Sequence, residues 1–501
     1  MRRYYPSFIL IIVLLGQSVA GYAVEVSVRG GLSTGLDIYD RRDQGPSMDL
    51  GEKGAADSSS VAEDDDEEDY QRILIRPLLA IDGSTERSSL GFTYQPSFYY
   101  DYLNEEDGVN HSASLSLRNR VSEAWSLSVI DSLLQSDIAE DVAVAETSST
   151  QLESGSTATS ATAGQRESDR ISDEKGRRKY TTNTLQFLSD YAYGQDSLFS
   201  MGYTYEILRN DDVVDDEYQD FDRHQASISL AHRLNRLWRA SLAGQYVRGL
   251  YDEPDNDTAA IATDIQTADV AVEPSDDLDE YYADAGVEYD GISRHPLSLD
   301  YGLAVYNYDD ETLGDSEIHN LTFGWRWLYS PQLTWSAKAG PSYATTDGQD
   351  DTWSFNGMIG VDYTIERGRF HLGVEKGLER RNFTGEVDDN GLIDYWDGRA
   401  DFSYQLLEST TVALFAGYRY DDQDEVVLAA DAARLLENDL IETVTTQRFY
   451  TGCSVRYSFW QWYALDLSYR YADQTSDDPG DEYDEHMVML TLSFSKDFWK
   501  W

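Results

Sequence analysis

The chain has 501 residues, with 92 acidic against 39 basic side chains and a formal net charge of −53 at pH 7. A charge this negative repels phosphates and argues against nucleic acid as a partner. The single cysteine, Cys453, excludes an intramolecular disulfide.

The N-terminus has the pattern of a secretion signal. Arg2 and Arg3 form a short basic region, residues 8–15 form an apolar core, and small residues ending at Ala20 or Ala23 offer a cleavage site. The apolar core is too short to span a bilayer as a helix. We therefore expect residues 1–23 to be a signal peptide and the mature chain, residues 24–501, to be exported across the inner membrane of a bacterium.

Most of the mature chain alternates between apolar and polar residues, which is the period of a β-strand with two different faces. Near the end, Leu465 and Leu467 would share one face, and Asp466 and Ser468 the other. The same alternation predicts strands at 24–39, 73–82, 90–102, 111–120, 125–134, 181–193, 198–209, 224–234, 238–251, 281–289, 297–308, 319–329, 333–345, 353–365, 369–383, 395–406 and 412–420, and the last strands between 445 and 501.

Tyrosine and tryptophan flank the apolar rows, and short turns alternate with longer, acidic connections. Both features are typical of a transmembrane β-barrel with aromatic girdles at the two membrane interfaces. We therefore predict an all-β fold, a single antiparallel transmembrane barrel of about 20 strands (range about 16 to 22) in the outer membrane. Its periplasmic turns would be short, and its long acidic extracellular loops would cover residues 40–69, 136–178, 252–279 and 421–444.

The last of these loops contains apolar residues at helical spacing between Val426 and Val444. The segment is interpreted as a helix, either in an exposed loop or folded into the barrel mouth.

Charged residues on the inward rows are the candidate site. Charges facing lipid are costly, so these side chains must face an interior where they are hydrated or paired. Two interpretations stay open: a polar lumen that passes hydrophilic solutes, and an ion-pair network that only fills the barrel. A barrel of this strand number is too wide for side chains alone to close, which favours the lumen. The candidate lumen-lining residues are Arg326, Arg399, Arg419, Arg456, Arg470, Asp284, Glu288, Asp362, Asp401 and Asp466.

Other candidates carry weaker signals. Inward tyrosines could stack on sugar rings, and the candidates are Tyr39, Tyr99, Tyr282, Tyr306 and Tyr450. The acidic runs at residues 64–66 and 252–257 could bind divalent cations, although they lack EF-hand spacing. None of the seven histidines has metal-ligand spacing or lies in a nucleophile motif. We therefore expect no catalytic residues, no metal site and no cofactor.

The opening strand, Val26-Ser-Val-Arg-Gly-Gly-Leu-Ser-Thr-Gly-Leu-Asp-Ile-Tyr-Asp-Arg41, resembles the start of the β-barrel porin type 2 family. The resemblance is one of layout and extends loosely over residues 24–501. It implies an outer-membrane barrel, in some members associated with exopolysaccharide systems. The aromatic ending departs from the family pattern, because Lys496 interrupts it and Trp499-Lys500-Trp501 follows.

The predicted function is passage of hydrophilic solutes or exported polysaccharide across the outer membrane. The alternative is a non-conducting structural or surface-interaction barrel that acts through its acidic loops. The expected partners are outer-membrane lipid, lipopolysaccharide bridged by cations, the barrel-insertion machinery and polysaccharide. The sequence assigns no oligomeric state.

Overall fold

The computed structural model describes residues 25–43, 67–136, 179–210, 218–251, 277–309, 314–347, 351–384, 391–426, 441–477 and 482–500. Within these ranges all regular secondary structure is β-strand, and there is no helix long and apolar enough to cross a membrane. The predicted signal peptide lies outside the described residues.

The described chain forms twenty strands. Their bounds are β1 Glu25–Asp43, β2 Glu67–Ser84, β3 Ser88–Asp101, β4 Glu106–Arg120, β5 Trp125–Ser136, β6 Tyr180–Gly194, β7 Ser197–Asn210, β8 Phe221–Arg233, β9 Trp238–Tyr251, β10 Leu278–Tyr289, β11 Leu297–Tyr308, β12 Ser316–Leu328, β13 Leu333–Thr346, β14 Thr352–Ile365, β15 Gly368–Arg380, β16 Leu392–Leu407, β17 Thr410–Val426, β18 Ile441–Phe459, β19 Tyr463–Ser476 and β20 Tyr483–Lys500.

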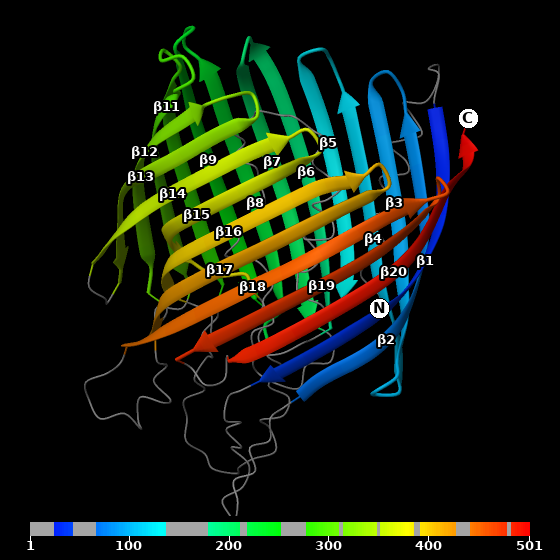
Figure 1. The fold of residues 1–501 in the computed structure, drawn as a ribbon. Helices are drawn as coiled ribbons and strands as arrows, with labels where there is room; N and C mark the ends of the chain where they lie inside the picture. Colours follow the sequence, from blue (N-terminus) through cyan, green and yellow to red (C-terminus); the bar gives the residue numbers. More distant parts are fainter. Residues whose placement is uncertain are drawn as a thin grey trace, which may run out of the picture.

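The strands form one closed antiparallel barrel (Figure 1). Each strand pairs with its neighbours in the sequence, and β1 also pairs with β20 along most of its length. Closure therefore leaves no edge strand in the barrel. The predicted fold class and strand number are confirmed.

The two ends of the barrel differ. One end, which we name the turn end, carries only short connections. These are residues 85–87, 121–124, 195–196, 234–237, 290–296, 329–332, 366–367, 408–409 and 460–462. The chain also starts β1 and finishes β20 there, and Figure 1 shows these turns along its top and right. The opposite end, named the loop end, carries the connections that follow the odd-numbered strands.

The outward face is an apolar belt. On neighbouring strands β19 and β20, Leu465, Leu467, Leu490 and Leu492 are all exposed, and similar rows continue around the barrel. At the turn end, exposed tryptophans include Trp460, which is 79% exposed. So large an apolar surface is too extensive for a soluble monomer and matches the lipid-facing band of an outer-membrane barrel.

The interior is filled at one end and hollow at the other. On β8 the inward residues Phe221, Arg223 and Gln225 at the loop end are buried, whereas Ser229 and Arg233 toward the turn end are partly exposed. The inward rows of β1, β7, β9, β19 and β20 follow the same gradient. The lumen is therefore wide at the turn end and obstructed at the loop end.

The predicted loop bounds need correction. Residues 40–43 and 67–69 belong to β1 and β2, Ser136 ends β5, and residues 278–279 begin β10. Residues 421–426 and 441–444 of the predicted helical loop likewise extend β17 and β18. The alternation of apolar and polar residues ends where the outward side chains become polar, so the sequence pattern ends the strands too early. The antiparallel hydrogen bonds of the backbone continue further, because they do not depend on apolar side chains. The remaining parts of these loops lie outside the described residues.

The orientation of the barrel predicts which positions are reached from outside the cell. In a chain with Cys453 replaced by Ser, a cysteine at Leu103, which is exposed in the loop-end turn after β3, should react with a membrane-impermeant maleimide on intact cells. A cysteine at Ser122, in the turn after β4, should react only after the cells are opened. The reversed pattern would show that the turn end faces outward.

Candidate functional site

The candidate site is the hollow part of the lumen, and the strand register decides which charges reach it. Directly opposed residues of an antiparallel pair share a face. By this rule the register places all ten candidate lumen-lining residues on the inward side of their strands. The decisive pairs are Asp397 with Arg419, Arg456 with Asp466, Asp362 with His371, and Glu288 with Ser298.

Most of the ten form ion pairs on the wall toward the turn end. Arg326 Nη2 lies 2.5 Å from Glu288 Oε1, and Arg399 Nε lies 2.9 Å from Asp401 Oδ2. The longest of these pairs joins Arg456 Nε to Asp466 Oδ1 at 3.7 Å.

Asp362 is held by an arginine and a histidine that lie outside the predicted set. Arg369 Nη2 lies 3.1 Å from Asp362 Oδ1, and His371 Nδ1 lies 3.0 Å from the same oxygen. Asp284 is exposed in the middle of β10. All these side chains are partly hydrated, so charges of both signs alternate around the hollow half of the barrel.

Two of the ten are packed away from water. Arg419 is buried on β17 between two carboxylates, with Glu379 Oε1 2.6 Å from Nη2 and Asp421 Oδ1 2.8 Å from Nε. Arg470 on β19 is buried beside Glu485, and its side chain is only 10% exposed. Arg419 thus links β17 to β15, and Arg470 links β19 to β20, at the obstructed end, and neither lines open space.

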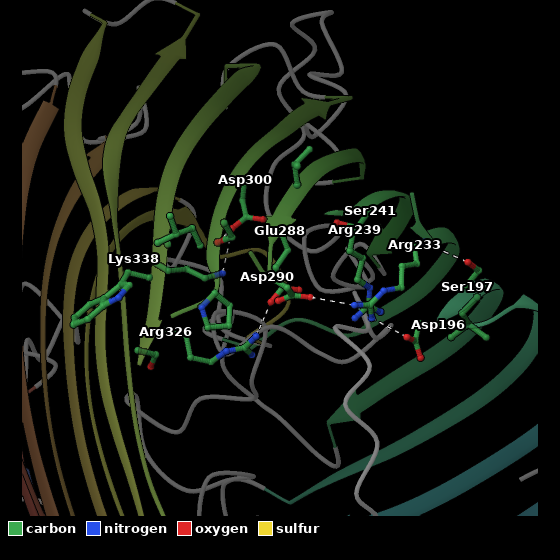
Figure 2. A pocket seen from close by; sticks show the side chains of 18 of the residues that line it. Asp196, Ser197, Arg233, Arg239, Ser241, Glu288, Asp290, Asp300, Arg326 and Lys338 are labelled. Carbon is green, nitrogen blue, oxygen red and sulfur yellow. Dashed lines mark hydrogen bonds and ion pairs between the residues drawn. The ribbon is translucent and has the colours of Figure 1, made fainter. Parts of the chain in front are cut away.

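A recess of about 820 Å³ opens in the wall formed by β6–β14 toward the turn end (Figure 2). Arg233 Nη1 lies 2.8 Å from Asp196 Oδ2, and its Nη2 lies 3.6 Å from Asp290 Oδ2. Lys338 Nζ lies 3.6 Å from Asp300 Oδ2. Figure 2 shows these side chains and the Arg326–Glu288 pair reaching into the same space from different strands. Residues Asp196, Arg233, Arg239 and Lys338 extend the set predicted from the sequence.

The obstruction at the loop end comes partly from the β15–β16 hairpin, which leaves the barrel wall. Pairing between β14 and β15 stops at Gly357 and Lys376, whereas β15 and β16 stay paired up to Arg380 and Leu392. Ser354 Oγ, on the inward side of β14, donates to Asp394 Oδ2 at 2.8 Å. Since Asp394 lies on the outward side of β16, the hairpin must pass inside β14.

Residues 378–384, which we name the inward tip, pack against the inner wall of strands far from β15 in the barrel. Phe383 is fully buried, with its ring centroid 5.3 Å from that of Phe221 and the Arg223 guanidinium 4.3 Å from its centre. A Cβ on Gly249 would approach the Phe383 ring to 2.8 Å, so only glycine allows this contact. Arg380 Nη1 donates to Ser316 Oγ at 3.0 Å.

Asn382 is the polar centre of this contact. Its Nδ2 donates to Glu280 Oε1 at 2.6 Å, its Oδ1 accepts from Tyr308 Oη, and its backbone carbonyl accepts from Tyr251 Oη. Two strands, β10 and β11, thus hold the Asn382 side chain, and a third, β9, holds its backbone carbonyl. The tip is a built-in constriction of the lumen. Of the helix predicted at 426–444, residues 426 and 441–444 are strand, and the rest lies outside the described residues.

The structure places only some of the candidate tyrosines where a solute could reach them, and it does not describe the acidic runs. Tyr39, Tyr282 and Tyr306 are buried and therefore cannot stack on a passing sugar, whereas Tyr99 and Tyr450 are partly exposed. Residues 64–66 and 252–257 lie outside the described residues. Among those that are described, no group of three or more His, Cys, Asp and Glu could hold a metal ion.

The histidines are dispersed, and most lie on the outward face. Five of them accept or donate a hydrogen bond at a tyrosine hydroxyl: His111 with Tyr94, His224 with Tyr203, His232 with Tyr193, His319 with Tyr301 and His486 with Tyr469. His295 contacts Trp325. Only His371 faces the lumen, beside Asp362. An amphipathic His–Tyr pair suits the aromatic girdle at a membrane interface.

No protein-family model matches the sequence, and a search of curated proteins found no match. The structure is similar to the FrpB iron transporter from Neisseria meningitidis (F3-3 variant), with 10% identity, a TM-score of 0.49, and coverage of 94% of this chain and 82% of that chain. It is also similar to Pseudomonas aeruginosa OpdK with vanillate (9% identity, TM-score 0.39, coverage 94% and 99%) and to a BenF-like porin from Pseudomonas fluorescens Pf-5 (10%, 0.41, 94% and 99%). Likenesses this weak carry no function to this chain, and the resemblance to type 2 porins stays a prediction.

Proposed function

We propose that this chain is a porin-like channel of the outer membrane that passes hydrophilic solutes, with its wide vestibule on the periplasmic side and its constriction on the outside. The observation that carries the proposal is the hydrated inner wall, where opposite charges such as Arg456 and Asp466 or Arg399 and Asp401 face one another with partly exposed side chains. Ion pairs that stay hydrated fit a wall that faces water, because burying charges in a packed interior costs free energy.

One observation favours the alternative, a structural barrel that does not conduct. Inward side chains at the loop end are buried on many strands, and the inward tip packs across the interior. A channel with this constriction would pass only small solutes in its resting state. For that reason exported polysaccharide is a less direct fit than small hydrophilic molecules, and its passage would require the tip to move.

Conductance of the purified protein in planar bilayers separates the two functions. We expect small, stable channels, because the constriction narrows the lumen without removing its charged wall. As a control for assembly, the same preparation should run as a heat-modifiable barrel on gels. Barrels that are heat-modifiable but electrically silent would overturn the channel proposal and leave the structural one.

The partners follow from the location. The outward apolar belt would contact outer-membrane lipid, and the carboxylates at the loop end would meet lipopolysaccharide phosphates through bridging divalent cations. A barrel that closes between its first and last strands also requires the barrel-insertion machinery. We propose no enzymatic activity, no nucleic-acid partner and no cofactor.

A further inference from the structure

Arg239 differs from the other cations of the recess. Arg233, Arg326 and Lys338 each lie within ion-pair distance of a carboxylate. Arg239 faces the same recess from β9, yet it forms no ion pair or hydrogen bond within the described part of the chain, and its Nε is buried without a partner. Figure 2 shows it beside Arg233.

The register explains why its neighbours leave it unpaired. Arg239 lies between Arg233 on β8 and Glu288 on β10, each directly opposite it. The Glu288 carboxylate bonds to Arg326 at 2.5 Å instead. Arg233 carries the same charge as Arg239, and like charges directly opposite on neighbouring strands are destabilising. An arginine cannot relieve this by losing its proton, because its guanidinium stays charged in proteins.

Resting on the proposed channel function, we infer that Arg239 is the anion-binding group of a solute site in this recess. A carboxylate there would neutralise Arg239 and accept the two parallel N–H groups that a guanidinium offers. The surrounding carboxylates are already engaged by Arg233, Arg326 and Lys338, so they do not compete for this position.

The rest of the lining defines the class of solute. Ser241, Ser298 and Ser336 supply hydroxyls around the recess, and its volume of about 820 Å³ is that of a small-molecule site. The lining combines the unpaired Arg239 guanidinium with several hydroxyls, and apolar residues such as Leu198, Trp325 and Met358 line the rest. It therefore fits a small polyhydroxylated acid, such as a sugar acid, better than a neutral sugar, which would leave the guanidinium unpaired.

Direct binding tests the site without relying on conduction. Calorimetry on the purified barrel in detergent would use gluconate as the probe, with glucose as the neutral comparison. The variants are Arg239→Gln and Arg239→Lys. The matched control is Arg118→Gln, which removes an inward arginine near the turn end of β4, on a different wall and outside the recess. Heat-modifiability on gels confirms that each variant is folded.

We expect wild type and Arg118→Gln to bind gluconate equally and more tightly than glucose. Arg239→Gln should weaken gluconate binding by roughly tenfold or more, because a charge-assisted bidentate contact is lost, and Arg239→Lys should recover part of it. Undiminished binding by Arg239→Gln, equal loss in Arg118→Gln, or no binding by wild type would each overturn the site. Silent bilayers with specific gluconate binding would instead refute the channel and leave the site standing.

Discussion

Replacing Asn382 and Phe383 together by alanine is expected to raise single-channel conductance several-fold, because the inward tip would lose the contacts that hold it across the lumen. The Asn382 side chain bonds to Glu280 of β10 and Tyr308 of β11, and Phe383 is fully buried against Phe221 and Tyr251. The barrel wall itself does not depend on either residue, since neither belongs to a strand. The measurement is conductance in planar bilayers at fixed salt.

A second variant reaches the same contact from the other side. Gly249→Val places a side chain where the Phe383 ring lies, and it should also release the tip. The matched control is Gly244→Val on the same strand, because a Cβ at Gly244 meets no atom closer than 3.7 Å. If both the double alanine variant and Gly249→Val keep wild-type conductance, the tip is not the constriction that limits flow.

Arginine at both Leu465 and Leu467 is expected to abolish assembly of the barrel in membranes. Both leucines lie on the outward face of β19 and are exposed. A lipid-facing arginine near the bilayer midplane costs about 2–4 kcal/mol, so two of them approach the whole stability of a typical domain. The measurement is the heat-modifiable fraction in isolated outer membranes.

The control for this experiment lies on the inward face of β19 and of its neighbour β18. Replacing Arg456 by Gln and Asp466 by Asn removes a hydrated ion pair without leaving one partner unpaired. Assembly should be unchanged, and the ion selectivity of the channel should shift. Failure to assemble after the luminal changes, together with normal assembly after the leucine changes, would mean that inside and outside are exchanged.

The faces of the strands could be predicted from the sequence, because a membrane outside and water inside impose a strict period of two. Leu465 and Asp466 are assigned correctly by parity alone. The extent of the strands could not be predicted from the sequence, because backbone pairing continues past the apolar belt at residues 40–43 and 421–426.

The candidate site was predicted only in part for a related reason. Parity identifies Arg419 and Arg456 equally as inward residues. Whether such a residue is hydrated depends on carboxylates that other strands contribute, such as Glu379 beside Arg419. The inward tip left no signal, because residues 378–384 continue an ordinary charged strand pattern. Its position depends on Gly249, Glu280 and Tyr308, which are far away in the sequence.

The pairing of β1 with β20 has a consequence for the order of folding. Arg29 and Asp497, which bond at 3.0 Å across this seam, are separated by 468 positions. Loop-closure entropy makes such a contact the slowest to form, and it cannot form until the last strand has been synthesised and exported. Every earlier intermediate has two long unpaired strand edges, which are templates for aggregation. The chain therefore spends its whole period of export in need of a chaperone, and deletion of β20 alone should turn a membrane protein into a substrate for periplasmic proteases.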